Sequence, residues 1–288
     1  MIYISSACFK SDTIKGSVET LAMNGFNNIE LSGGTKYYDR IEFDILELKE
    51  RYDLNLLLHN YFPPPRDPFM LNLASLNNDV YKKSIELCKN AIRLSKKFGS
   101  KHYGVHAGFL IDFSPSEAGK KISYQHLNDR QKAIKRFCNA WDMLIDEANN
   151  DVSLYVENNV LSSTNARTYT ERNPLLLTDH ESYLELKEYM DFNLLLDIAH
   201  LKVSTNSLGL DFDEELEKLL QISDYIHLSN NNGLHDQNKP FTKNSSLIRK
   251  IKKYHLEGKL ITLEVYSEIK KITSSYSVIT ELVKSNYY

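Results

Sequence analysis

The sequence has little cysteine, and it contains no long apolar run. Its three cysteines, Cys8, Cys88 and Cys138, are odd in number and far apart in the chain. This usage argues against a disulfide framework and favours reduced thiols in the cytoplasm. No stretch approaches the ~18 apolar residues that a membrane span needs, and the N-terminus lacks the pattern of a signal peptide. We therefore expect a cytoplasmic protein with no membrane partner.

The sequence also has little net charge. Lys and Arg number 35 and Asp and Glu number 38, so the formal net charge is −3. This balance provides no general attraction for phosphate backbones, and we expect no nucleic-acid partner. Charged residues at 25% and hydrophobic residues at 42% are values of a globular protein, which excludes disorder as the main state.

The chain does contain a repeated alternation of short apolar runs and longer segments with helical periodicity. The runs are almost continuously apolar, which is typical of parallel strands buried on both faces. They occupy residues 2–6, 28–31, 54–59, 102–106, 154–157, 193–197, 225–228 and 260–265. Apolar residues three and four apart predict helices over residues 79–98, 131–149, 213–221, 245–253 and 276–284. We expect Asp12 to cap the first helix and Gly99 to end the third.

Eight strand–helix units in residues 1–288 predict a single α/β domain, a closed (β/α)₈ TIM barrel. An open doubly wound sheet would use the same local patterns. The first strand, however, is followed by SSACFKSDT and not by the glycine-rich turn of a dinucleotide site. The proline run at residues 63–65 indicates a stiff loop at the active-site rim. The polar stretch 159–178 predicts a long functional loop.

Imidazole and carboxylate side chains end most of the predicted strands. In a barrel these ends meet on one rim, where such enzymes have their active sites. Each residue alone is most simply a structural rim residue or a helix cap, but together they favour Zn²⁺ or Mn²⁺ over Ca²⁺. His102 starts its strand on the opposite rim and is expected to be structural. The rim residues are His59, His106, Glu157, Asp197, His200, His227 and Glu264, with Glu30, His235 and Asp236 as weaker candidates.

These strand ends resemble those of the xylose-isomerase-like TIM barrel superfamily, which holds sugar isomerases, epimerases and apurinic-site endonucleases. The resemblance spans essentially the whole chain, and its specificity lies in the ordered set because no single motif is specific. The motifs are NIELSGG, LLLHNYFPPP, YGVHAGF, LYVENN, LLLDIAH, YIHLSNNNG followed by HDQNKPF, and LITLEVY.

The isomerase and epimerase branch of that superfamily holds one divalent ion with Glu, Asp, His and Glu from strands five to eight. The resemblance transfers this set to Glu157, Asp197, His227 and Glu264. It implies that Glu157 and Glu264 exchange protons with carbon through an enediolate and that His200 polarises a substrate oxygen. The implied protein is a sugar or sugar phosphate isomerase or epimerase with a small carbohydrate substrate. The choice among Mn, Zn, Mg and Co stays open, as does a homodimer.

The endonuclease branch, which uses further ions, supplies the second hypothesis. His59, His106 and Glu157 match its second-metal set. A third set would need His200, Asp236 and a closing histidine, but Asn238 stands in that place and is a poor Zn²⁺ ligand. The second hypothesis is therefore a metal-dependent phosphodiesterase of the apurinic-site endonuclease type, with His59, His106, His200 and Asp236 as second-metal or substrate candidates. A dehydratase or lyase acting on a polyol-derived ketone is a third hypothesis, and a barrel that only binds its ligand is a fourth.

Overall fold

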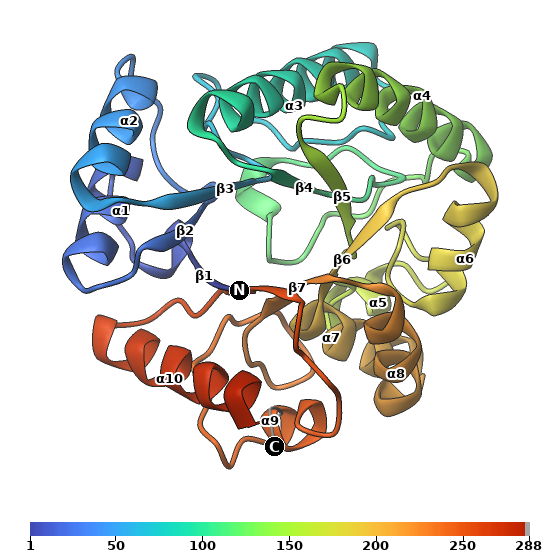
Figure 1. Cartoon of the computed structure of the whole chain (residues 1–288). Coiled ribbons are helices and arrows are strands. Elements are labelled where there is room, and N and C mark those ends of the chain that lie inside the picture. Colours follow the sequence, from blue (N-terminus) through green and yellow to red (C-terminus); the bar gives the residue numbers. More distant parts are fainter. Residues whose placement is uncertain (286–288) are drawn as a thin grey trace.

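Eight parallel strands close into a barrel in the computed structural model, which describes residues 1–285 (Figure 1). Each strand pairs with the next along the chain, and the last strand pairs with the first. The prediction of a (β/α)₈ barrel is confirmed. The strands are β1 (Ile2–Ser5), β2 (Asn28–Leu31), β3 (Asn55–His59), β4 (His102–His106), β5 (Ser153–Glu157), β6 (Asn193–Asp197), β7 (Tyr225–Leu228) and β8 (Leu260–Leu263).

Helices follow the strands and surround the barrel (Figure 1). The two longest, α3 (Asn78–Phe98) and α4 (Arg130–Ala148), pack against each other and bury their apolar sides. Gly99 ends α3 in the left-handed conformation, as expected. The others are α1 (Ile14–Met23), α2 (Ile41–Tyr52), α5 (Ser163–Thr168), α6 (His180–Tyr189), α7 (Ile198–Leu208), α8 (Phe212–Ile222), α9 (Ser246–Ile251) and α10 (Ile269–Ser285), with 3₁₀ turns η1 (Ser6–Cys8) and η2 (Pro115–Glu117).

The start of α1 corrects one prediction. Thr13 is the N-cap, because its hydroxyl accepts the backbone N–H of Gly16 at 3.2 Å from an extended backbone. Asp12 instead lies exposed, with a carboxylate oxygen 3.4 Å from the ammonium of Lys36. Asp and Thr can both cap a helix, so the residue type alone could not show that Thr13 has the extended backbone of an N-cap.

The segment after β5 corrects a second prediction, since residues 159–178 are not an irregular polar loop. They include α5, and Leu175, Leu176 and Leu177 in this segment are buried. The side-chain amide of Asn159 donates to the carbonyls of Ala107 and Leu176, both at 2.8 Å. These bonds hold the segment against the end of β4, where it forms part of the rim.

A packed aromatic layer fills the barrel on the side away from the rim that carries the titratable residues. Tyr3, Tyr155 and Tyr225 are buried there, and the rings of Tyr155 and Tyr225 meet nearly at right angles with centroids 5.2 Å apart. His102 packs on Tyr155 at 5.6 Å, at the end away from the rim, as expected of a structural histidine. Because Tyr225 and His227 are two residues apart on β7, they point to the same side of the sheet. The layer is thus a floor beneath the titratable side chains.

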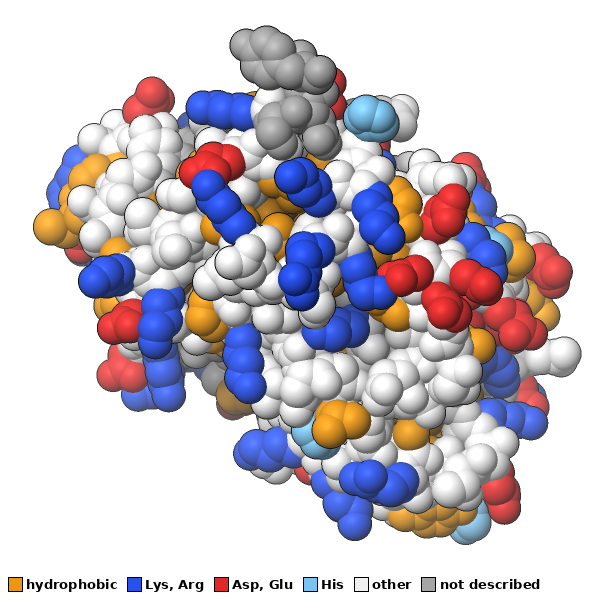
Figure 2. All heavy atoms as spheres, turned by 90° about the horizontal axis from the view of Figure 1, so that it is seen from below, with side chains coloured by type: hydrophobic (Ala, Val, Ile, Leu, Met, Phe, Trp, Pro, Cys, Tyr) orange, Lys and Arg blue, Asp and Glu red, His pale blue; other side chains and the backbone are white. Residues whose placement is uncertain are grey.

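The outer surface carries both signs of charge. Lys and Arg side chains are spread over the face shown in Figure 2, with acidic side chains among them. Within residues 1–285, no helix is long and apolar enough to cross a membrane.

Candidate metal centre

The sheet register brings the predicted ligands together at one end of the barrel. His106 pairs with Glu157 between β4 and β5, and Asp197 pairs with His227 between β6 and β7. Glu264 follows the last residue of β8, so it lies one position beyond the strand. Glu157, Asp197 and His227 are fully buried and Glu264 is almost so.

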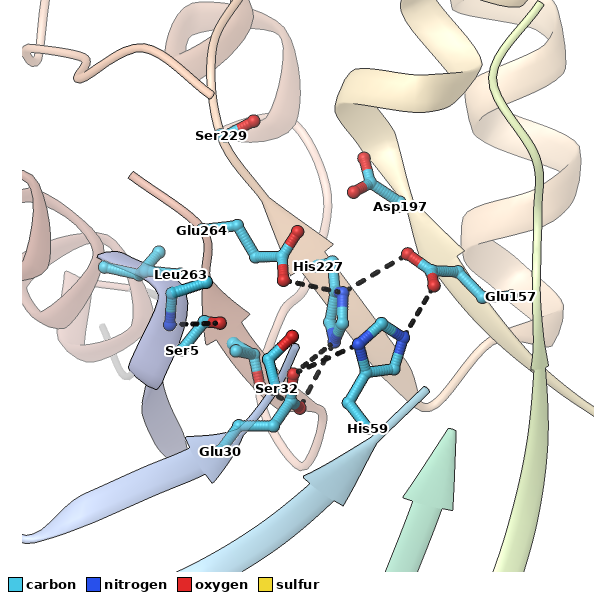
Figure 3. Close-up of polar contacts among 12 residues, drawn as sticks. Ser5, Glu30, Ser32, His59, Glu157, Asp197, His227, Ser229, Leu263 and Glu264 are labelled. Carbon is cyan, nitrogen blue, oxygen red and sulfur yellow. Dashed lines mark hydrogen bonds and ion pairs between the residues drawn. The ribbon is translucent and has the colours of Figure 1, made fainter. Parts of the chain in front are cut away.

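His227 is the centre of this arrangement (Figure 3). Its Nδ1 lies 3.3 Å from Glu157 Oε1 and 3.8 Å from Glu264 Oε1. Glu157, Asp197 and His227 each offer a ligand atom, and these atoms lie within 4.8 Å of one another. Glu264 contacts His227 but belongs to a different group of possible ligands, which it forms with Glu30, His59 and His227.

The donor atoms of this group fit a divalent cation. Glu157 Oε1, Asp197 Oδ2 and His227 Nδ1 are buried, and no hydrogen bond to them is made by any residue in the described part of the chain. A buried polar atom left in this state costs about 1–3 kcal/mol. Carboxylate oxygens with an imidazole nitrogen are ligands for Zn²⁺ and Mn²⁺. An ion bound here would satisfy all three atoms at once.

Neighbouring backbone groups hold Asp197 in place. Its Oδ1 accepts the backbone N–H of His200 at 2.8 Å and so caps α7, which leaves Oδ2 for the cluster. The side chain of Asn158 accepts the backbone N–H of Asp197 at 2.7 Å and donates to its carbonyl at 3.0 Å. Asn158 was missed in the sequence, although the polar ENN after an apolar strand was a signal.

His59 and His106 share Glu157 with the first group. His59 Nε2 lies 2.7 Å and His106 Nε2 lies 3.2 Å from the same oxygen, Glu157 Oε2. These three residues form a second group that could hold an ion. The structure therefore brings the expected second-metal residues together.

The third expected set does not contain a closing histidine. His200 Nε2 lies 3.5 Å from Asp236 Oδ2 and 3.6 Å from Asp197 Oδ2, and its Nδ1 lies 3.0 Å from the Asn158 carbonyl. The amide of Asn238 donates to Asp236 Oδ2 at 3.3 Å, while its oxygen accepts the Ser229 hydroxyl at 3.1 Å. In the described residues, His235 belongs to none of the three possible metal groups.

Glu30 is more central than the sequence indicated. It is fully buried, and its two oxygens lie 3.1 and 3.2 Å from His227 Nε2. The hydroxyl of Thr262 donates to Glu30 Oε2 at 2.9 Å, and the hydroxyl of Tyr225 donates to the same oxygen. An acidic residue inside the apolar run NIEL was the signal, because a buried carboxylate needs partners.

Burial and neighbouring charges separate the pKa values of the three carboxyl groups. Burial raises the pKa of Glu264 to about 7, and burial reinforced by Glu157 raises the pKa of Asp197 to about 6. Burial also acts to raise the pKa of Glu157, but the imidazoles of His106, His59 and His227 hold it well below its ordinary value. Two glutamates with opposite shifts suit the roles of proton donor and proton acceptor.

The pKa values of the histidines in the site also shift in opposite directions. Burial lowers the pKa of His106 to about 4. Burial also opposes the charged form of His227 and His200, but the carboxylates around each outweigh it and raise both pKa values well above the ordinary range. His227 and His200 are thus surrounded by negative charge, as expected for a site that attracts a cation.

A cavity of about 640 Å³ opens over this cluster, a size typical of small-molecule sites. His106, His200, Asp236 and Glu264 line this cavity. The segments 6–11 and 32–35, after β1 and β2, also line it, together with Tyr61 and Tyr266. Hydroxyl groups and aromatic rings thus face the space beside the cluster.

Comparisons with known proteins agree with this fold. The xylose isomerase-like TIM barrel family model matches residues 18–282. An uncharacterised protein of Methanocaldococcus jannaschii is 23% identical over 240 residues, which are 81% of this chain and 72% of that protein.

Solved structures are similar over almost the whole chain. A D-tagatose 3-epimerase-like protein has a TM-score of 0.72 at 20% identity, covering 100% of this chain and 99% of its own. The D-psicose 3-epimerase of Clostridium cellulolyticum has a TM-score of 0.63 at 12% identity, covering 99% and 98%. Endonuclease IV of Thermus thermophilus has a TM-score of 0.61 at 13% identity, covering 99% of each. At these identities the similarity establishes a shared fold.

Proposed function

Because the chain belongs to the xylose isomerase-like TIM barrel family, we propose that it is a divalent-metal-dependent isomerase or epimerase of a sugar or sugar phosphate. One observation carries the proposal: Glu157 and Glu264 lie on two sides of His227 Nδ1 (Figure 3), and Glu264 lines a cavity of substrate size. The sugar epimerases among the similar structures support the same proposal.

The proposed ligands are Glu157, Asp197, His227 and Glu264. An ion held there would act as a Lewis acid toward the carbonyl and the adjacent hydroxyl of a ketose, and would favour the enediolate. This donor set is compatible with Mn, Zn, Mg or Co. It also leaves open whether His59 and His106 hold a second ion. His200, which lines the cavity, is proposed to contact a substrate oxygen.

The two glutamates are proposed to move the proton. Glu157, whose pKa is held low by its imidazole neighbours, is ionised and can remove the proton next to the carbonyl. Glu264, which lies on the other side of His227 and lines the cavity, can return a proton to the other face, which gives epimerisation. Return by the same carboxylate to the neighbouring carbon gives aldose–ketose isomerisation. A general base of this kind contributes a factor of about 10²–10⁴ in rate.

Two further reactions are open to this site. The group of His59, His106 and Glu157 favours a phosphodiesterase of the apurinic-site endonuclease type, and Asn238 in place of a histidine argues against it. A dehydratase or lyase acting on a polyol-derived ketone would begin with the same proton removal. We further propose a cytoplasmic protein, supported by three free cysteines. The homodimer stays a prediction.

Hydrogen–deuterium exchange tests the proposal. A panel of ketoses and their phosphates is incubated in D₂O with Mn²⁺ or Mg²⁺, and NMR follows the carbon next to the carbonyl after the ion is removed. We expect exchange with the wild-type protein and loss of exchange in Glu264→Gln. Glu268→Gln is the matched control, because Glu268 is exposed four residues further along. No exchange with any ketose, together with cleavage of an abasic oligonucleotide, would support the phosphodiesterase instead.

A further inference from the structure

Glu30 enters the barrel from β2 and meets the side of His227 that faces away from the predicted ligands. Glu30 Oε1 lies 3.1 Å from His227 Nε2, whereas His227 Nδ1 faces Glu157 and Glu264 (Figure 3). The two nitrogens of one imidazole therefore have different carboxylate neighbours. Glu30 itself is fully buried.

We propose that Glu30 is a positioning residue of the metal centre, an inference that rests on the metal site of the proposed function. Glu30 accepts a hydrogen bond from the Nε2–H of His227 when the ion is bound. The proton is thereby kept on Nε2, and the Nδ1 lone pair is directed toward Glu157, Asp197 and Glu264. A metal-bound histidine commonly donates its other N–H to a carboxylate, which fixes both the tautomer and the ring plane.

The surroundings of Glu30 are built to hold it as an acceptor. The hydroxyls of Tyr225 and Thr262 both donate to Oε2. Thr262 is the sheet partner of His227, and Tyr225 lies two residues before His227 on β7. Three donors thus converge on one carboxylate from β7 and β8. The ring of Tyr225 is itself fixed against Tyr155, with ring centroids 5.2 Å apart.

A direct bond from Glu30 to the ion is the competing interpretation. Glu30, His59, His227 and Glu264 each offer an atom within 4.8 Å of the others. However, Oε2 makes hydrogen bonds with the hydroxyls of Tyr225 and Thr262 and with Nε2 of His227. Oε1 has no hydrogen bond from the described residues, but it lies 3.1 Å from the same Nε2. The two nitrogens of one imidazole point in different directions and cannot both bind a single ion. If the ion is bound by Nδ1 of His227, Glu157 and Asp197, then Glu30 contacts a ligand of the ion and not the ion itself.

The test measures metal affinity and the state of the His227 ring in the full-length protein. Zn²⁺ binding is measured by competition with a chelator for the wild type and for Glu30→Gln, and ¹⁵N NMR of the Zn²⁺-loaded protein reports which imidazole nitrogen carries a proton. We expect the affinity of Glu30→Gln to fall by about 10–100-fold, the range for outer partners of metal-bound histidines. The wild type should show a slowly exchanging Nε2–H on His227 that exchanges faster in the variant.

Two further variants make the result specific. Glu215→Gln removes the charge of another buried glutamate, which lies away from the metal centre and accepts the backbone N–H of His180 at 2.7 Å. This variant should bind Zn²⁺ like the wild type. Thr262→Val removes one hydroxyl that holds Glu30 and should weaken Zn²⁺ binding severalfold, which provides a test if Glu30→Gln does not fold.

The outcomes separate this inference from the proposed function. Wild-type affinity in both Glu30→Gln and Thr262→Val would overturn the positioning role alone. Anomalous density from Mn²⁺ at about 2.0–2.3 Å from Glu30 would overturn it in favour of a direct ligand. A wild-type protein that binds none of the divalent ions would overturn the metal centre and this inference together.

Discussion

Replacing Asp197 by Asn separates metal binding from folding, because the two side-chain oxygens of Asp197 have different tasks. Oδ1 caps α7 by accepting the backbone N–H of His200 at 2.8 Å, and an amide oxygen can do the same. Oδ2 lies in the cluster without a hydrogen bond from the described residues and is the predicted ligand atom. Asp197→Asn should therefore keep the fold and lose the ion.

The size of the effect follows from linkage. An ion at a hundred times its dissociation constant stabilises the folded state by about 2.7 kcal/mol. The unfolding entropy of ~2.1 cal/mol/K per residue gives roughly 0.6 kcal/mol/K for 288 residues, so the wild-type Tm should rise by about 4–5 °C. Loss of a ligand should weaken binding by at least about 100-fold, more than the loss of an outer partner. At the same ion concentration the variant then gains at most about 0.4 kcal/mol, which is less than about 1 °C.

The assay is differential scanning calorimetry with and without Mn²⁺ or Zn²⁺ after treatment with a chelator. Asp179→Asn is the matched control, since Asp179 is also a buried helix N-cap, accepting the backbone N–H of Ser182 at 2.9 Å, but it lies outside the metal groups of the described residues. The metal-free Tm of both variants should lie near that of the wild type. If the ion raised the Tm of Asp197→Asn as much as the Tm of the wild type, the assignment of Asp197 as a ligand would be refuted.

Three further results are expected. Gly104→Ala places a Cβ 2.6 Å from Leu195 Cδ1 and 3.1 Å from His59 Cδ2, so urea unfolding should show a loss of about 1–3 kcal/mol, and an unchanged stability would contradict the tight packing beside His59. His59→Ala should reduce turnover less than Glu264→Gln, measured on the ketose that shows exchange, because His59 contacts Glu157 but is not in the proposed ligand set. Burial lowers the pKa of His102, so below about pH 6.5 His102 binds more protons in the unfolded chain than in the folded one, and its contribution to the unfolding free energy falls as the pH falls. Between about pH 7.5 and about pH 5.5 the unfolding free energy of His102→Asn should therefore fall less, or rise more, than that of the wild type, and equal changes would show that His102 does not contribute.

The strands were predictable because parallel strands buried on both faces are almost continuously apolar. Their ends agree with the structure to within two residues, as at β8, which stops at Leu263 where the apolar pattern continues to Val265. The helices were less accurate where the pattern is weak. α10 begins at Ile269, seven residues before the predicted start, because KKITSSYS has little amphipathic contrast. The cap of α1 was misplaced by one residue for a similarly local reason.

The local pattern of the chain is sufficient to place five titratable residues at strand ends, and barrel closure then requires these ends to meet. They are His59, His106, Glu157, Asp197 and His227. Which atoms face each other depends on the tertiary structure. Glu30 and His227 are 197 residues apart in sequence, yet the sheet places them in contact. His227 directs Nε2 toward Glu30 and Nδ1 toward Glu157, and both contacts depend on side-chain rotamers and on the register around the whole barrel. Neither is encoded in local periodicity, because both result from packing between strands distant in the chain.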